Sequence, residues 1–174
     1  MDNLLQSVQA VLSSTPARWL SLTEALPAEL LTRPPAPGEW SALNCLQHLL
    51  DAERLVFPVR VQCLLAGQDF AAFDPDAQGT VQASSQTPAA VAAQFAETRA
   101  ANLALLNQVT LADFSRTARH AELGLVTLAE LLHEWAGHDL MHTVQAEQAL
   151  MQPFIAGCGP WRPYFIAHEI GQKK

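Results

Sequence analysis

One long helical pattern near the C-terminal end of this 174-residue chain constrains the fold most strongly. The pattern begins at Thr127-Leu-Ala-Glu130, which fits a capping box, because each end residue can accept a hydrogen bond from the other's free backbone amide. Apolar residues then recur at helical spacing to about Met151, and we expect the helix to stop before Pro153. Helices of about 20 to 25 residues are roughly 30 to 38 Å long, which is the length of the helices in a four-helix bundle.

Three further segments show helical spacing of apolar residues. The first runs from about Asp2 to Leu26, and Pro16 within it predicts either a kink or a short helix that gives way to a second one capped by Thr15. The prolines between Pro27 and Trp40 predict an extended connection in the second half of that segment.

The second and third helices have their own start signals. Ser41 is placed as the N-cap of a helix from Ala42 to about Ala66, with a bend at Pro58. Thr87 and a first-turn proline then predict a helix to about Gln108.

The remaining segments lack helical periodicity. Residues 67–86 are rich in Asp, Gly, Gln, Ser and Pro, and this length suits a connection that crosses from one end of a bundle to the other. Residues 110–126 look irregular, and the aromatic tail from Gly157 is expected to pack as a lid or to carry one short helix. We therefore predict a single all-α domain over residues 1–174.

Composition and charge narrow the function. Hydrophobic residues make up 49% of the chain and aromatic residues 7%, and Ala and Leu dominate, a balance that favours helix over strand. The formal net charge of −7, without a basic patch, disfavours nucleic-acid binding. No apolar run reaches the roughly 18 residues of a membrane span, and no signal peptide is evident at the N-terminus. Three cysteines without CxxC spacing fit a reducing compartment, so we expect a cytoplasmic protein with no membrane partner.

Three histidines point to a metal site. His138 and His142 lie four residues apart on the last long helix, so their imidazoles face the same way and can bind one divalent ion. His48, which lies among leucines on the second helix, is the best candidate for a third ligand. Three protein ligands would leave open positions for water or substrate, as in catalytic metal sites.

Other polar residues near this pattern have less direct roles. Glu134, one turn before His138, and Gln145, nearly one turn after His142, are candidates to orient an imidazole from outside the ligand set. For His120, His133 and His168 we expect ordinary hydrogen-bonded or solvated side chains. Trp40, Trp135 and Trp161 could shape a pocket, although a core role is expected for the first two.

Two stretches together carry a resemblance to a known family. They are PGEWSALNCLQHLLDAE, with Trp40, Ser41 and His48, and LLHEWAGHDLMHTVQAE, with His138, Asp139, His142 and Gln145. In their order and separation they resemble the DinB/YfiT-like superfamily of metal-binding helical bundles. The chain departs from the family pattern in the Thr-Val that follows His142 and in its aromatic tail. These differences leave the three histidines intact, but they mean that the family's substrates do not carry over directly to this chain.

The resemblance implies a fold and a chemistry. The fold is a four-helix bundle with an up-down-down-up course and a long crossover between helices two and three. The site is a three-histidine centre for a divalent cation, with zinc or nickel expected first and iron, manganese or copper left open. It also implies a homodimer, a link to stress response, and activity of a thiol-dependent kind, as in bacillithiol S-transferases and the more distant mycothiol-dependent maleylpyruvate isomerases.

The sequence leaves three functions open, and it identifies no catalytic residue. The first is a thiol S-transferase, in which the metal activates a small thiol for attack on an electrophilic substrate. The second is a metal-dependent hydrolase with a carboxylate such as Glu134 as base, although Gly137 stands where an HExxH motif would need its second histidine. The third is a metal-binding or dimerising protein without catalysis.

Overall fold

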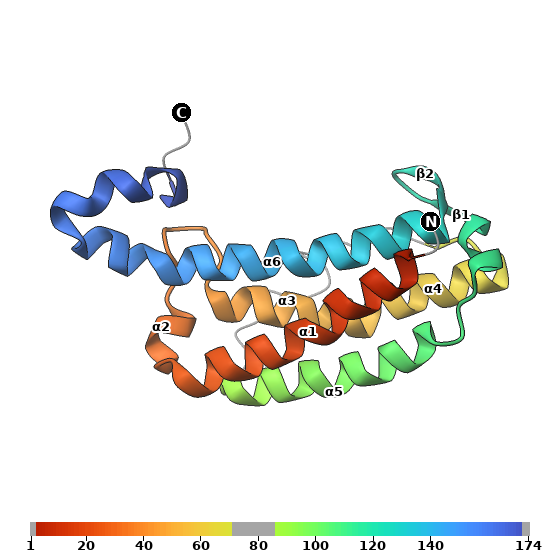
Figure 1. The fold of residues 1–174 in the computed structure, drawn as a ribbon, viewed down its shortest axis with the longest axis horizontal. Coiled ribbons are helices and arrows are strands. Elements are labelled where there is room, and N and C mark those ends of the chain that lie inside the picture. The colour runs from red at the N-terminus through yellow and green to blue at the C-terminus, as the bar shows by residue number, and fades with distance from the viewer. Residues whose placement is uncertain (1–2, 71–85, 172–174) are drawn as a thin grey trace.

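Four long helical segments lie side by side in the computed structural model, which describes residues 3–70 and 86–171 (Figure 1). The helix bundle predicted from the sequence is confirmed. The segments are α1 (Leu4–Ala25), α3 (Ala42–Leu55) continued by α4 (Phe57–Ala66), α5 (Pro88–Leu106) and α6 (Leu128–Gly157). The predicted crossover falls largely on residues 71–85, outside the described residues, so the up-down-down-up course stays a prediction. None of the described helices is long and apolar enough to span a membrane.

Helix α1 is a single helix that carries Pro16 in its interior. Of the two predicted arrangements, the short helix capped by Thr15 is therefore wrong. Thr15 is fully buried, and its hydroxyl donates a 2.6 Å hydrogen bond to Oδ2 of Asp139 on α6. Thr15 therefore links α1 to α6 and does not cap the start of a helix. The short helix α2 (Ala28–Thr32) follows, and the chain is non-helical from Arg33 to Ser41, as the prolines predict.

The predicted second helix is divided into two. Helix α3 ends at Leu55, and α4 begins at Phe57 with Pro58 in its first turn. A bend at Pro58 was expected, but the break comes earlier, at Val56, because proline fits a first turn and lacks the amide that a helix interior requires. Arg60 of α4 and His48 of α3 line the same cavity.

The helix starts agree with the sequence. The Ser41 side chain accepts a hydrogen bond from the backbone amide of Asn44, and the Thr87 side chain accepts one from the backbone amide of Ala90. Thr127 and Glu130 form the predicted capping box. Each cap satisfies amides that the first turn of a helix leaves without partners.

The segment before α6 is more regular than predicted. After the 3-10 helix η1 (Leu111–Ser115), strands β1 (Thr117–His120) and β2 (Gly124–Thr127) form an antiparallel hairpin that runs directly into α6. The expectation of an irregular segment, and with it a strictly all-α fold, is therefore wrong for residues 117–127. Gly124 has a φ of 79°, which favours glycine at the end of the turn.

Helix α6 continues through Pro153 to Gly157, so its predicted end at about Met151 is also wrong. Proline removes one intrahelical hydrogen bond, but Ile155 is buried in the turn beyond it and holds that turn in place. The tail then forms the 3-10 helix η2 (Gly159–His168), which turns back beside the end of α6 (Figure 1). Gln152 joins the two, because its amide donates to the carbonyl oxygen of His168 at 2.9 Å.

A buried polar layer divides the core into two apolar clusters. On α1, α5 and α6 the buried apolar residues of the two clusters lie on opposite sides of this layer along the helix, whereas on α3 Ala52 of the first cluster directly precedes Glu53. The layer joins all four helices by hydrogen bonds and ion pairs, and its members are Thr15, Glu53, Arg99, Asn102, Trp135 and Asp139. Because a misaligned helix would leave a buried charge unpaired, the layer fixes the relative heights of the helices.

Candidate metal centre

The three predicted histidines meet between α3 and α6. Nε2 of His48 lies 2.9 Å from Nε2 of His138, and ring nitrogens of all three residues lie within 4.8 Å of one another. His48 and His142 are buried, and His138 is partly buried. The structure thus brings together residues that are 90 positions apart in the chain, as the sequence analysis proposed.

Burial keeps these imidazoles neutral. Loss of solvation, with a contribution from the neighbouring His142, lowers the pKa of His48 to about 4. Burial and the nearby His142 and His48 lower the pKa of His138 to about 3. Burial also lowers the pKa of His142, although its hydrogen bond with Gln145 opposes this shift. All three rings are therefore neutral near pH 7, the form in which imidazole binds metal ions.

The nitrogen geometry fits a divalent cation. Two ligand nitrogens that are each about 2.0 to 2.1 Å from one ion lie roughly 3 Å apart when the angle at the ion is near 90°. The Nε2 atoms of His48 and His138 have this separation, and each carries a lone pair in the tautomer that has its proton on Nδ1. A hydrogen bond between them would use only one of these lone pairs, whereas a cation would use both. The donor set fits zinc, nickel and the other divalent ions that accept imidazole.

The two residues predicted to orient the ligands behave differently. Nδ1 of His142 lies 2.8 Å from Oε1 of Gln145, which leaves Nε2 of His142 for the metal. Glu134 contacts none of the three imidazoles among the described residues. Its carboxylate is half exposed and lies 3.9 Å from Nη1 of Arg60. It lines the cavity beside the histidines, and a role in orienting them stays a prediction.

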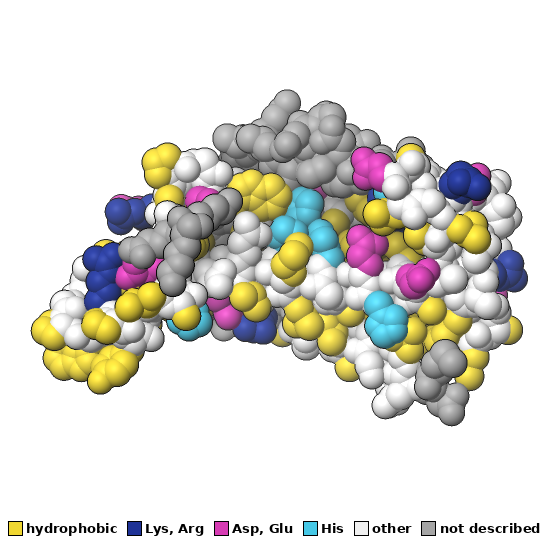
Figure 2. Space-filling view, turned by 90° about the horizontal axis from the view of Figure 1, so that it is seen from above, with side chains coloured by type: hydrophobic (Ala, Val, Ile, Leu, Met, Phe, Trp, Pro, Cys, Tyr) yellow, Lys and Arg dark blue, Asp and Glu magenta, His cyan; other side chains and the backbone are white. Residues whose placement is uncertain are grey.

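An open cavity of about 410 Å³ leads to the histidines. Figure 2 shows this face of the molecule, where histidine side chains gather near the middle with acidic and apolar side chains beside them. Trp40 forms part of the wall, because its ring stacks on His142 with centroids 5.7 Å apart, and it also packs, partly buried, against one of the two apolar core clusters, as expected. Trp135 does lie in the core, and Trp161 is 65% exposed on the tail, outside the cavity lining.

Two functional candidates were missed at the sequence level. Arg60 of α4 and His120 of β1 both line the cavity, and both are more than 90% buried. His120 was expected to be an ordinary histidine because no pattern places residues 117–120 on a strand. His133 and His168 are exposed and do not line the cavity, in agreement with the expectation for them.

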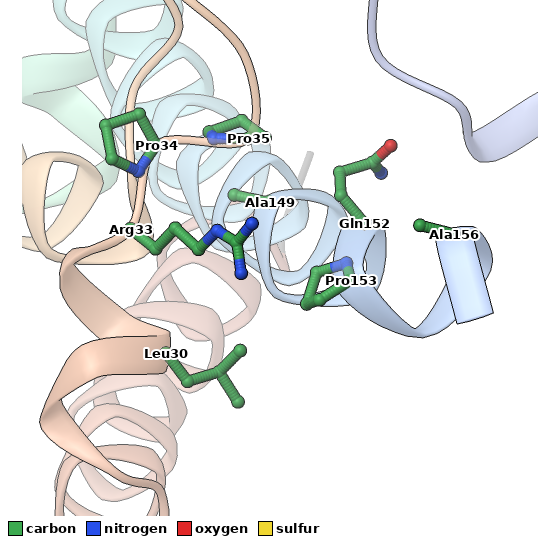
Figure 3. A pocket seen from close by; sticks show the side chains of 8 residues that line it. All are labelled: Leu30, Arg33, Pro34, Pro35, Ala149, Gln152, Pro153 and Ala156. Atoms are coloured by element: carbon green, nitrogen blue, oxygen red, sulfur yellow. The ribbon is translucent and has the colours of Figure 1, made fainter.

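A separate pocket at the other end of the molecule lacks these features (Figure 3). It measures about 130 Å³ and lies between the connection after α2 and the last turns of α6. Arg33 is the one charged side chain in its described lining, and the other groups are aliphatic or amide: Leu30, Pro34, Pro35, Ala149, Gln152, Pro153 and Ala156. We assign the chemistry of this protein to the histidine cavity.

Comparison with known proteins supports the same assignment. The family model of the DinB superfamily matches residues 12–146, a range that contains all three histidines. Among solved structures, YfiT from Bacillus subtilis, described as a probable metal-dependent hydrolase with an unusual four-helix bundle topology, matches with a TM-score of 0.73 and 21% identity over 86% of this chain and 87% of that one. A search of curated proteins finds no match. The chain belongs to the DinB superfamily.

Proposed function

We propose that this protein is a metal-dependent thiol S-transferase in which His48, His138 and His142 hold a divalent cation, with zinc or nickel expected first. The observation that carries the proposal is the convergence of three neutral imidazoles at an open cavity. Three protein ligands leave room for a substrate at the ion, in contrast to a closed structural site with four. The resemblance of the sequence to thiol-dependent family members adds support.

The cation would supply one chemical effect, which is to lower the pKa of a bound small thiol so that the thiolate predominates near neutral pH. The protein supplies the surroundings. Trp40 and Phe57 line the cavity beside the histidines and hold an electrophile against the sulfur, while their rings exclude water from that side. In the transfer, the sulfur forms a bond to the electrophilic carbon and the leaving group departs with the electron pair of its own bond.

Hydrolysis is a second candidate, and one observation favours it. The Glu134 carboxylate lines the same cavity and is half exposed, so it could accept a proton from an attacking water. YfiT is itself described as a probable hydrolase. Against this, the Glu134 carboxylate pairs with Arg60 at 3.9 Å, and among the described residues no hydrogen bond joins it to His138 or His142.

A thiol conjugation assay separates these functions. The metal-loaded protein is incubated with monochlorobimane and one of several small thiols, and the fluorescent thioether is followed as chloride leaves. We expect turnover that depends on metal and is lost in a His142→Ala variant. No turnover with any thiol would reject the transferase. Ester or amide cleavage by the same metal-loaded protein would then support hydrolysis, and inactivity in both assays would support a non-catalytic metal-binding protein.

The hydrogen bond of Gln145 to His142 leads to a further prediction. A Gln145→Ala variant is expected to bind zinc about 10- to 100-fold more weakly, because His142 loses the acceptor that fixes its tautomer and ring orientation. Competition with a chromophoric chelator measures this change. Gln145→Glu retains an acceptor at the same place and should lose less affinity. Equal affinities for Gln145→Ala and the unmodified protein would show that this contact does not support the site.

A further inference from the structure

The histidine cavity continues into a second compartment of about 250 Å³. Arg60, His120, Leu123 and Glu134 line both spaces and therefore mark the junction between them. Beyond the junction the wall consists of the apolar Phe70, Val126 and Leu131 and of Glu130, whose carboxylate accepts hydrogen bonds from the backbone and hydroxyl of Thr127. A molecule that starts at the three histidines and extends into the second compartment must pass Arg60 and His120.

Arg60 is a buried cation with an incomplete set of partners. It is 8% exposed, and its guanidinium lies over the ring of Phe70 at 5.3 Å. Within the described part of the chain it hydrogen bonds to no carboxylate, and its nearest acidic oxygen, on Glu134, is 3.9 Å away. The other buried arginine, Arg99, contacts two carboxylates at 2.7 and 2.9 Å. Because a buried guanidinium ordinarily has such partners, Arg60 has room for an anion that residues 3–70 and 86–171 do not supply.

The contact between Arg60 and His120 strengthens this conclusion. The backbone amides of Glu122 and Leu123 both donate to Nδ1 of His120, at 3.1 and 3.3 Å. Nδ1 must therefore carry the lone pair, which puts the ring proton on Nε2. Nε2 faces Nη2 of Arg60 at 3.2 Å, so two N–H donors meet there without an acceptor between them. An oxygen atom placed beside both would accept from each.

We propose that Arg60 and His120 form a binding site for the carboxylate of an organic substrate whose apolar part fills the second compartment. The planar fork of arginine suits the two oxygens of a carboxylate, and the His120 N–H adds a donor. This proposal rests on the proposed function in taking the histidine cavity as the substrate site. It narrows the substrate class to small molecules that carry an acid group next to an apolar group.

Two glutamates compete with such an anion for Arg60. Glu134 and Glu122 are both near enough to raise the pKa of Arg60, although burial has the larger, opposite effect. Both carboxylates are exposed to solvent and remain hydrated without Arg60. They weaken the attraction for an anion and do not fill the space between Arg60 and His120. A Glu134→Gln variant should therefore bind the acid more tightly than the unmodified protein.

The test compares two ligands that share the phenylpropyl skeleton and differ in the end group, 3-phenylpropionate with a carboxylate and 3-phenyl-1-propanol with an uncharged hydroxyl. Their binding to the full chain is measured by calorimetry, both with zinc loaded and after treatment with a chelator. We expect the acid to bind about 10- to 100-fold more tightly than the alcohol in both forms. Arg60→Met should reduce this ratio to about one, and Arg60→Lys should give an intermediate ratio because lysine retains the charge but not the fork.

Controls make each outcome decisive. Arg54 is an exposed arginine one helix away that pairs with Gln94, and Arg54→Met should leave the ratio unchanged. Equal binding of acid and alcohol by the unmodified protein would overturn the proposal, as would a preference for the acid that survives in Arg60→Met or disappears on chelation. Thiol transfer to the uncharged electrophile monochlorobimane is measured in parallel with the same panel of small thiols, and its failure with every thiol would reject the proposed function separately from the acid site.

Discussion

Replacing His138 with alanine is expected to weaken zinc binding by more than about 100-fold, which is the upper end of the loss from removing a residue that only supports a ligand. His138 lies close to both other ligand candidates, because its Nε2 lies 2.9 Å from that of His48 and its ring centroid lies 4.5 Å from that of His142. Removing it leaves two imidazoles, and the larger hole beside Phe57 admits water. Metal content after desalting and affinity by chelator competition measure the effect.

His133→Ala is the matched control, since His133 lies on the same helix, is exposed and points about 140° away from His138. It should bind zinc like the unmodified protein. A bound ion also stabilises the fold by about 2.7 kcal/mol at a free concentration 100 times its dissociation constant. A chelator should therefore lower the melting temperature of the unmodified protein and leave that of His138→Ala unchanged. Stoichiometric zinc in purified His138→Ala would contradict the assignment.

The parts of the fold that the sequence predicts are those governed by local chemistry. Ser41, Thr87 and Thr127 start their helices where predicted, because a capping side chain acts on amides two or three residues away. The proximity of His48 to His138 and His142 is also predictable from the sequence, because a polar ring among leucines on one helix needs a polar partner on another helix. Helical spacing then limits which partners can reach it.

The errors arise where tertiary contacts outweigh local preference. Proline predicts an end for α6 before residue 153, yet the burial of Ile155 carries the helix further. The hairpin at residues 117–127 has strands of only four residues and no Asn-Gly or Asp-Gly turn, so its pattern is too short to recognise. The sequence signal for the hairpin is Gly124, followed two and three residues later by the β-branched Val126 and Thr127 of the second strand.

Arg60 is a charged residue that the sequence pattern also singles out. It interrupts the apolar run Phe57-Pro-Val-Arg-Val61 as His48 interrupts its leucines, and a charged residue in such a run also needs a partner. Its neighbour His120, however, is supplied by the hairpin, 60 residues away. The sequence therefore could have marked the arginine as functional but could not have identified what it faces.

Arg99→Met is expected to destabilise the fold by about 3 to 5 kcal/mol, the usual cost of removing one partner from a buried ion pair. Arg99 is 1% exposed, and it donates to Oε1 of Glu53 and to Oδ1 of Asp139. Burial opposes its charge, but these hydrogen bonds outweigh burial and raise the pKa of Arg99. Without it, two carboxylates that are each 1% exposed would remain in the core near one another with no neutralising charge. Denaturant unfolding measures the loss.

The loss of stability in Arg99→Met is expected to come from the missing positive charge and not from the change in side-chain volume. Methionine fills much of the arginine volume, so an Arg99→Met cavity is small and cannot by itself account for several kcal/mol. Adding Glu53→Gln and Asp139→Asn to Arg99→Met removes both unpaired charges and should recover part of the lost stability. Arg54→Met, at an exposed arginine of the same bundle, should change stability by less than about 0.5 kcal/mol. If Arg99→Met is as stable as this control, or if the triple variant is less stable than Arg99→Met alone, the polar layer does not hold the four helices together through charge.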